Sequence, residues 1–249
     1  MTKRILVTGG GKGVGAEIVR ALVAGGYDVD FTYRSSADAA RALAQELVDA
    51  NPGRAVNGYA LDLSDKQALE AFCERIEGES YYGFVHNAGQ SYDALTAMMA
   101  QDKAEAAMQV NFWSFTRLAK ALMRTMLRAR EGRIVAIGSV AALQATAGNA
   151  AYAASKGALL SYARTLAIET AKRGVTVNVI APGFIDTDMM APYAAYRDTM
   201  DKQIPAGRFA KPSEVAGLAA FLMSEPAGYI TGAVLPIDGG LTAMVGVHR

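Results

Sequence analysis

Short runs of apolar, often β-branched residues alternate with longer segments of helical period, and this alternation is the strongest constraint on the fold. The expected strands lie at 4–8, 28–33, 56–61, 82–86, 134–137, 175–180 and 234–237. The expected helices begin near Val14 and otherwise lie near 36–50, 65–76, 103–130, 151–173 and 213–223. Apolar strands separated by helices are typical of a parallel sheet with helices on both faces. We therefore predict an α/β fold with a doubly wound, Rossmann-type sheet of about seven strands.

The chain has 249 residues, 51% of them hydrophobic, which is enough for one sizeable core. No Ser/Gly/Pro-rich linker, low-complexity tract or fixed-period repeat interrupts it, so we predict a single domain over 1–249. The longest irregular stretch is 183–211. A loop of that length in a compact domain is usually functional, and we expect a lid or binding loop there.

Charge and cysteine content exclude several classes of function. Lys and Arg number 25 against 24 Asp and Glu, which gives a net charge of +1 and no basic run that would attract nucleic acid or an anionic membrane surface. Cys73 is the only cysteine, so an intrachain disulfide and an all-cysteine metal site are excluded. We expect Cys73 to be buried, no metal site, and a cytoplasmic protein.

Two segments could be mistaken for targeting or membrane signals. The charged start Met1–Arg4 is followed by only a few apolar residues before a run of glycines, so no export is expected. The segment 134–155 contains no charge for 22 residues, which is the length of a membrane span. Polar residues such as Ser139, Asn149 and Tyr152 interrupt it, and a strand followed by a polar loop explains it better.

The first expected strand leads directly into a glycine-rich turn, Thr8 to Gly15, and the turn opens an amphipathic helix. Glycine at positions 9, 13 and 15 would let a pyrophosphate approach the backbone N–H groups and the positive end of the helix. A tight turn without a ligand is the alternative, but the strand–turn–helix context favours a dinucleotide site.

The end of the second strand decides which dinucleotide fits. NAD sites usually carry a carboxylate there for the ribose 2′-hydroxyl, whereas this strand ends Thr32-Tyr33-Arg34-Ser35-Ser36. Arg34 and Lys12 offer two cations for a 2′-phosphate, with serine hydroxyls as further donors. This pattern predicts NADPH rather than NADH. The alternative is that Arg34 is only a solvated loop charge.

Tyr152 and Lys156 are four residues apart on an expected helix and so share one face. A cation near a phenol favours its ionised form and makes it a better proton donor to a carbonyl oxygen near neutral pH. An isolated Tyr-x-x-x-Lys match is weak, because a surface pair on a helix has the same spacing.

Taken together, these motifs resemble the short-chain dehydrogenase/reductase family. The order and spacing of Thr8-Gly9-x-x-x-Gly13-x-Gly15, Asn87-Ala88-Gly89, Asn111, Ser139, Tyr152-x-x-x-Lys156 and Pro182-Gly183 carry the resemblance. It implies that Tyr152 donates and accepts the proton, and that Lys156 holds the nicotinamide ribose and lowers the tyrosine pKa. It further implies that Ser139 hydrogen-bonds the substrate carbonyl and that Asn111 anchors a water in a proton relay.

The resemblance also implies the cofactor contacts. Asp62, with Leu63 beside it, would contact adenine, and Asn87 to Gly89 would form the turn along the adenine ribose. The remaining predicted contacts are Thr8, Gly9, Lys12, Gly13, Val14, Gly15, Arg34, Ser35, Tyr152, Lys156, Pro182, Gly183, Ile185 and Thr187. Two positions depart from the family pattern: His86 stands where a second Asn is common, and Asn149 where close relatives often have Gln. We expect His86 to be a hydrogen-bonded residue at a strand end.

Within the family, the chain is most similar to 3-oxoacyl-acyl carrier protein reductases, on segments such as 132–135, 138–140, 182–189, 229–232 and 238–240. This implies NADPH-dependent reduction of a 3-oxoacyl thioester in fatty acid, polyketide or aryl polyene biosynthesis. Arg130 and Arg173 match positions that receive the acidic carrier, at the rim of the crevice, although each could be a solvated helix-end cation. Met189 and Tyr193, with Met190, Pro192 and Tyr196, could line an acyl site or simply pack.

The resemblance implies a homotetramer in which the helices near 103–130 and 151–173 pair across one interface and the C-terminal segment across another. Phe112, Trp113 and Phe115 could contribute, although core packing is the safer assignment for each. Two other functions remain open: a dehydrogenase of a small alcohol, sugar or cyclic ketone, and a cofactor-binding regulator without turnover. The presence of both Tyr152 and Lys156 argues against the regulator. An enoyl reductase is disfavoured because related enzymes space these two residues more widely.

Overall fold

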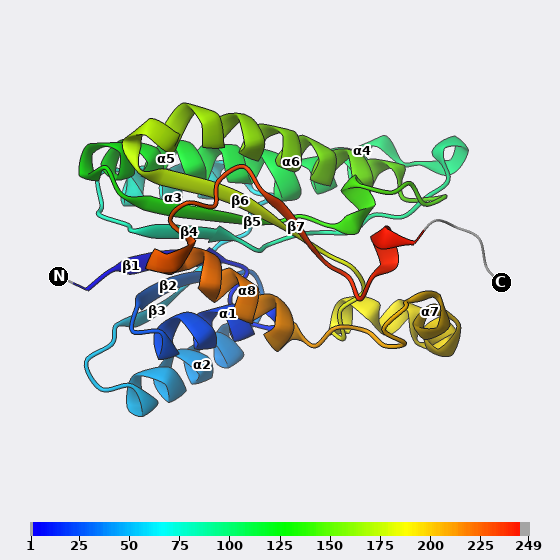
Figure 1. The fold of residues 1–249 in the computed structure, drawn as a ribbon, viewed down its shortest axis with the longest axis horizontal. Coiled ribbons are helices and arrows are strands. Elements are labelled where there is room, and N and C mark those ends of the chain that lie inside the picture. Colours follow the sequence, from blue (N-terminus) through cyan, green and yellow to red (C-terminus); the bar gives the residue numbers. More distant parts are fainter. Residues whose placement is uncertain (1, 245–249) are drawn as a thin grey trace.

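Parallel strands form the centre of the molecule, and the inner ones are buried on both faces. In the computed structural model, which describes residues 2–244, these strands join in one parallel sheet (Figure 1). They are β1 Arg4–Thr8, β2 Asp28–Tyr33, β3 Val56–Ala60, β4 Gly83–His86, β5 Gly132–Ile137, β6 Val175–Pro182 and β7 Val234–Ile237. The seven strands lie in the order β3-β2-β1-β4-β5-β6-β7, so the predicted doubly wound sheet is confirmed.

Helices cover both faces of the sheet. They are α1 Gly13–Ala24, α2 Ala37–Ala50, α3 Lys66–Ile76, α4 Gln101–Met108, α5 Ser114–Ala129, α6 Ala150–Thr170, α7 Arg197–Gln203 and α8 Pro212–Met223. Figure 1 shows α1, α2 and α8 on one face and α3 to α6 on the other. Successive strand residues point to opposite faces, so Leu6 packs under the α3 to α6 layer while Ile5 and Val7 pack under the other.

The strand order reverses at β1, which pairs with β2 on one side and β4 on the other. In open α/β sheets, ligands bind outside the carboxyl ends of the strands at such a switch point. The glycine turn follows β1, the Asn87–Gly89 turn follows β4, and Ser139 and Gly183 follow β5 and β6. The chain therefore brings its main motifs to one edge of the sheet.

The expected helix over 103–130 is not continuous. A π-helical turn, Gln109–Trp113, separates α4 from α5. A π turn holds one more residue than an α turn, and such turns occur frequently at functional sites. The apolar pattern continues on both sides of the turn, so periodicity alone did not reveal the break.

The stretch 183–211 is partly helical, so the expectation of an irregular loop was wrong in part. It contains a 3₁₀ segment, Asp188–Tyr196, and the short helix α7. Pro192 lies inside the 3₁₀ segment and none of that segment is buried, which leaves no apolar period to detect. Figure 1 shows this segment and α7 at the edge of the sheet where the motif residues lie.

Other expectations have clear outcomes. The uncharged segment 134–155 is β5, a loop and the start of α6, as predicted. Cys73 is buried, and burial raises its pKa to about 11. Phe115 is fully buried, but Trp113 is 50% exposed, so core packing was the wrong assignment for Trp113. Among residues 2–244, no helix has the length and apolar content that spanning a membrane requires.

Candidate functional site

The turn between β1 and α1 has a backbone that only glycine can follow. Gly9 and Gly13 have positive φ angles of 67° and 54°. A Cβ atom on Gly15 would lie 2.0 Å from the Gly9 carbonyl oxygen. Lys12, the N-cap of α1, makes no side-chain cap bond, so the first N–H groups of the helix remain open to an anion. This cradle fits the pyrophosphate of a dinucleotide.

The Asn87–Gly89 turn after β4 is bonded directly to this cradle. The Thr8 hydroxyl oxygen accepts hydrogen bonds from the backbone N–H of Asn87 at 3.1 Å and of Ala88 at 3.2 Å. The Asn87 amide donates to the carbonyl oxygens of Thr8 and Gly9 at 3.2 and 3.1 Å. These bonds join the two strand ends that flank the switch point.

The residues predicted to hold the adenosine lie beside the same edge. Arg34 and Ser35 are exposed after β2. After β3, Asp62 accepts hydrogen bonds from Ser64, and these bonds, together with the Arg34 charge, lower the pKa of Asp62. Leu63 is buried in the core beneath the α3 to α6 layer.

Lys12 does not stand free at the mouth of the site. Its ammonium lies 3.7 Å from the Asp188 carboxylate, at the start of the 3₁₀ segment. Nearby, a Cβ atom on Gly13 would lie 3.6 Å from the Thr187 methyl group, which brings Thr187 against the glycine turn. Gly183 is more confined, because a Cβ there would lie 3.0 Å from Asp238. Pro182 ends β6, and Ile185 forms a β-bridge with Ala210.

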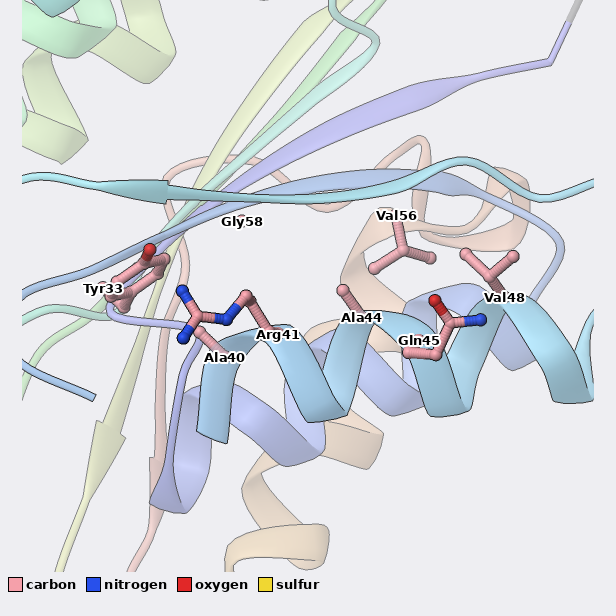
Figure 2. A pocket seen from close by; sticks show the side chains of 8 residues that line it. All are labelled: Tyr33, Ala40, Arg41, Ala44, Gln45, Val48, Val56 and Gly58. Carbon is pink, nitrogen blue, oxygen red and sulfur yellow. The ribbon is translucent and has the colours of Figure 1, made fainter. Parts of the chain in front are cut away.

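A separate cavity of about 270 Å³ runs between α2 and β3 (Figure 2). Tyr33 closes one end and Arg41 of α2 points toward it, while Gly58 leaves space along β3. None of the predicted catalytic residues lines this cavity. The cavity therefore lies beside residues predicted to bind the cofactor and not beside the predicted catalytic residues.

Tyr152 and Lys156 lie on successive turns of α6, with the Lys156 ammonium 5.8 Å from the centre of the Tyr152 ring. The Lys156 Nζ donates a hydrogen bond to the Ile137 carbonyl oxygen at 2.8 Å. Burial lowers the pKa of Lys156 to about 8. A Cβ on Gly89 would lie 3.3 Å from this ammonium, so Lys156 packs beneath the Asn87–Gly89 turn.

The Tyr152 phenol is positioned to exchange a proton with a bound group. Burial raises its pKa, a hydrogen bond with the Ser139 hydroxyl opposes this rise, and the Asp93 charge adds to it. The phenol is therefore protonated near neutral pH, as a proton donor must be. Ser139 follows β5, and its oxygen also accepts a bond from the Ala141 N–H at 3.1 Å.

Asn111 is buried in the π turn and bonds to two partners that the sequence did not indicate. Its Oδ1 accepts from the Gln90 N–H at 2.8 Å, and its Nδ2 donates to the Gln90 carbonyl at 2.9 Å and to the Ser155 hydroxyl oxygen at 2.8 Å. Ser155 in turn donates to the Tyr152 carbonyl oxygen at 2.7 Å. Neither Gln90 nor Ser155 belongs to a motif, so only the folded chain identifies them.

The 3₁₀ segment bonds to the loop that follows β4. The Tyr193 hydroxyl donates a hydrogen bond to the Asp93 carboxylate. Met189, another residue proposed for the acyl site, is 53% exposed. Asp93 was missed by sequence reasoning because a single carboxylate in a polar loop carries no pattern.

Arg130 and Arg173 do not lie at the sheet edge that carries Ser139, so their predicted place at the rim of the site was wrong, while their contact with the carrier stays a prediction. Arg130 ends α5 just before β5, and its guanidinium donates to the Lys172 carbonyl oxygen at 3.1 Å. Both arginines thus sit at the amino edge of the sheet. Ser139 lies beyond the opposite end of β5, roughly 20 Å away at about 3.3 Å per residue.

The two positions that depart from the family pattern are both next to the site. His86, the last residue of β4, is fully buried and lies 3.1 Å from the Thr8 hydroxyl, as expected for a hydrogen-bonded strand end. The Asn149 Oδ1 is buried and has no hydrogen-bond partner among residues 2–244.

Comparisons with known proteins agree with this site. A family model described as enoyl-(acyl carrier protein) reductase matches residues 9–242. The chain is 40% identical over 244 residues to the 3-oxoacyl-[acyl-carrier-protein] reductase FabG of Salmonella typhimurium, covering 96% of this chain and 97% of that protein.

Two solved structures share the fold over nearly the whole chain. The short-chain dehydrogenase/reductase from Serratia marcescens is 35% identical with a TM-score of 0.89, covering 96% of this chain and 98% of that one. A structure titled "ElxO with NADP Bound" is 26% identical with a TM-score of 0.88, covering 98% and 100%. Given these matches and the site geometry, the chain belongs to the short-chain dehydrogenase/reductase family of nicotinamide-dependent oxidoreductases.

Proposed function

We propose that this protein reduces a 3-oxoacyl thioester, carried by acyl carrier protein, to the 3-hydroxyacyl thioester with NADPH. The observation that carries the proposal is the grouping of the Ser139 and Tyr152 hydroxyls with the buried Lys156 ammonium at the switch-point edge. The relative named 3-oxoacyl-[acyl-carrier-protein] reductase, at 40% identity, supports the choice of substrate.

In this proposal the protein supplies orientation and a proton. The bound nicotinamide supplies a hydride to the carbonyl carbon. The Ser139 hydroxyl donates a hydrogen bond to the carbonyl oxygen and the Tyr152 phenol gives that oxygen its proton, which completes the alcohol. The Lys156 ammonium holds the nicotinamide ribose and stabilises the phenolate that Tyr152 becomes.

Tyr152 must then regain its proton. We assign this to a relay from Lys156 through a water held by Asn111. Both amide hydrogens of Asn111 and one lone pair of its Oδ1 are already bonded to Gln90 and Ser155. The second lone pair of Oδ1 is the part of this side chain that can accept a bond from the water.

The charge pattern supports NADPH as the reductant. Arg34 is exposed directly after β2, and Lys12 in the glycine turn pairs with the exposed Asp188. A 2′-phosphate carries more negative charge than the Asp188 carboxylate and would compete for Lys12. The related structure with NADP bound is consistent with this choice.

The acyl group is proposed to lie under the 188–196 segment, against Met189 and Tyr193, which are exposed on the protein alone. With a carrier-bound substrate, the proposed reaction belongs to fatty acid, polyketide or aryl polyene biosynthesis. We propose that it takes place in the cytoplasm. Reduction of a small ketone by the same tetrad is the competing function, and enoyl reduction is the activity in the name of the matched family model.

We also propose a homotetramer. Trp113 on the π turn and Tyr162 and Ile168 on α6 are exposed by 50%, 37% and 81%. Burying such side chains against a second copy would remove their apolar surface from water. The predicted second interface uses a C-terminal segment that includes residues 245–249, which lie outside the described residues.

The substrate assignment is tested by NADPH oxidation with acetoacetyl-ACP, acetoacetyl-CoA, crotonyl-ACP and a panel of small ketones. We expect the highest kcat/KM for acetoacetyl-ACP. In the proposed complex the carrier presents the thioester on an arm that extends to Tyr152. Tyr152→Phe is the matched control: it lacks only the hydroxyl, so it should bind NADPH normally and turn over at background rate. A preference for small ketones or for crotonyl-ACP would replace the proposal with the corresponding alternative.

Cofactor choice is tested with Arg34→Ala. Loss of a charge-assisted contact of about 1.5–3 kcal/mol should lower kcat/KM for NADPH roughly 10- to 100-fold while that for NADH hardly changes. Arg20→Ala is the control, because Arg20 already pairs with Glu17 and Glu46 on α1 and α2. An unchanged NADPH to NADH ratio in Arg34→Ala would exclude the 2′-phosphate contact.

The pKa of Lys156 predicts the pH at which activity falls on the alkaline side of the pH profile. Its pKa in the protein is about 8, so the ammonium is present below that pH and is lost above it. We expect kcat/KM for NADPH, which reports the free enzyme, to fall as pH rises through about 8. Lys156→Arg stays charged throughout, so its lower rate should not fall in that range. An equal alkaline fall in both proteins would assign it to another group.

The oligomer is tested with Ile168→Asp. A carboxylate at this exposed site costs a monomer little but would be buried in a tetramer, so light scattering should show loss of the four-chain mass with the fold retained. Val48→Asp on α2, outside the proposed interface, should remain tetrameric. A monomeric natural protein would refute the proposal directly.

A further inference from the structure

His86 is a buried titratable residue that the proposed mechanism does not use. It ends β4 with no exposed surface, and its ring packs against Phe84 and Phe115 at centre distances of 6.0 and 5.4 Å. Burial, followed by the Lys156 charge, lowers the pKa of His86 to about 3. The imidazole is therefore neutral at working pH, and each ring nitrogen has a single role as donor or acceptor.

The bonds around Thr8 decide which nitrogen carries the proton. A threonine hydroxyl has two lone pairs and one hydrogen. Both lone pairs of Thr8 Oγ1 are occupied by the N–H groups of Asn87 and Ala88. Its hydrogen must then go to His86 Nδ1, 3.1 Å away, and the ring proton must lie on Nε2.

The Nε2–H faces the π turn. The carbonyl groups of Asn111 and Val110 lie close enough to favour a proton on the ring. Even so, Nε2 has no hydrogen bond of good geometry to any of the described residues. The Val110 carbonyl is already shared with the Ser114 hydroxyl at 2.7 Å. A buried donor held against these carbonyls acts on the turn that carries Asn111.

His86 consequently contacts both anchors of the loop that follows it. Thr8 holds the loop at Asn87 and Ala88, and Asn111 holds it at Gln90. Between these anchors lies Gly89, packed on the Lys156 ammonium. A shift of either anchor would move the surface against which Lys156 and the nicotinamide ribose are proposed to lie.

We propose that His86 is a positioning residue with two separate tasks: Nδ1 orients the Thr8 hydroxyl that holds the Asn87–Gly89 turn, and the ring edge with Nε2–H, next to the Asn111 and Val110 carbonyls, positions the π turn that carries Asn111. The first task governs cofactor affinity and the second governs turnover. The effect on turnover rests on the proposed reductase function, whereas the tautomer and the effect on cofactor affinity do not.

Two substitutions separate the tasks. An Asn side chain places its amide near the position of Nδ1, and a Gln side chain reaches the position of Nε2. His86→Asn should keep NADPH affinity within about twofold and lower kcat about five- to tenfold, because it removes the polar ring edge that lies next to the π-turn carbonyls. His86→Gln should weaken NADPH binding about five- to tenfold and keep kcat at saturating NADPH within about twofold. His86→Leu should show both losses.

The test begins without substrate. In a His248→Asn background, which leaves His86 as the single histidine, ¹⁵N NMR of the ring should show the Nε2–H tautomer and no titration between pH 5 and 9. NADPH affinity is then measured by fluorescence for the variants and for Thr8→Val with and without His86→Leu. We expect the losses from Thr8→Val and His86→Leu to be less than additive, because both remove the same bond.

An Nδ1–H tautomer, additive losses, or Asn and Gln variants that change Kd and kcat together in proportion to a lower Tm would each overturn the proposal and leave His86 as core packing. If the variants fail to fold, the ring tautomer measured in the natural protein tests the proposal: an Nε2–H ring supports it and an Nδ1–H ring overturns it. If the natural protein reduces no thioester, the proposed function fails, whereas the tautomer and the Thr8 coupling still test the positioning role.

Discussion

The hydrogen bonds between the Thr8 hydroxyl and the backbone of Asn87 and Ala88 hold the site together. They join the ends of β1 and β4, the two strands between which the sheet order reverses. The glycine turn and the Asn87–Gly89 turn both depend on this junction, because each follows one of its two strands, and the Lys156 ammonium packs beneath the second turn. Thr8 is fully buried, so water cannot replace these bonds if they are broken.

The site contains a buried charge that works against folding. The Lys156 ammonium is almost fully buried, bonds to the Ile137 carbonyl oxygen and has a lowered pKa. Burial penalises its charged form relative to the unfolded chain, so stability rises with pH between about 8 and the ordinary lysine value near 10.5. Such a residue is costly for the fold, and strongly perturbed pKa values of this kind cluster at functional sites.

Local patterns predicted the parts of the site that have a local physical cause. The glycine turn follows from close backbone approach at Gly9 and Gly15, and the Tyr152–Lys156 pair follows from helix spacing. The π turn at Asn111 did not follow, because an extra residue in a turn leaves the apolar period almost unchanged. Asp93, Gln90 and Ser155 contact site residues only through the folded chain, and no spacing indicates them.

The sequence by itself determined the sheet, the turn at its switch point and the residues that face the same edge, because strand period, glycine and helix spacing act over a few residues. Only the tertiary structure decided that Arg130 lies at the opposite edge, that Lys12 pairs with Asp188, and that His86 lies between Thr8 and the π turn. Those relations join residues far apart in the chain, and their geometry depends on how strands and helices pack.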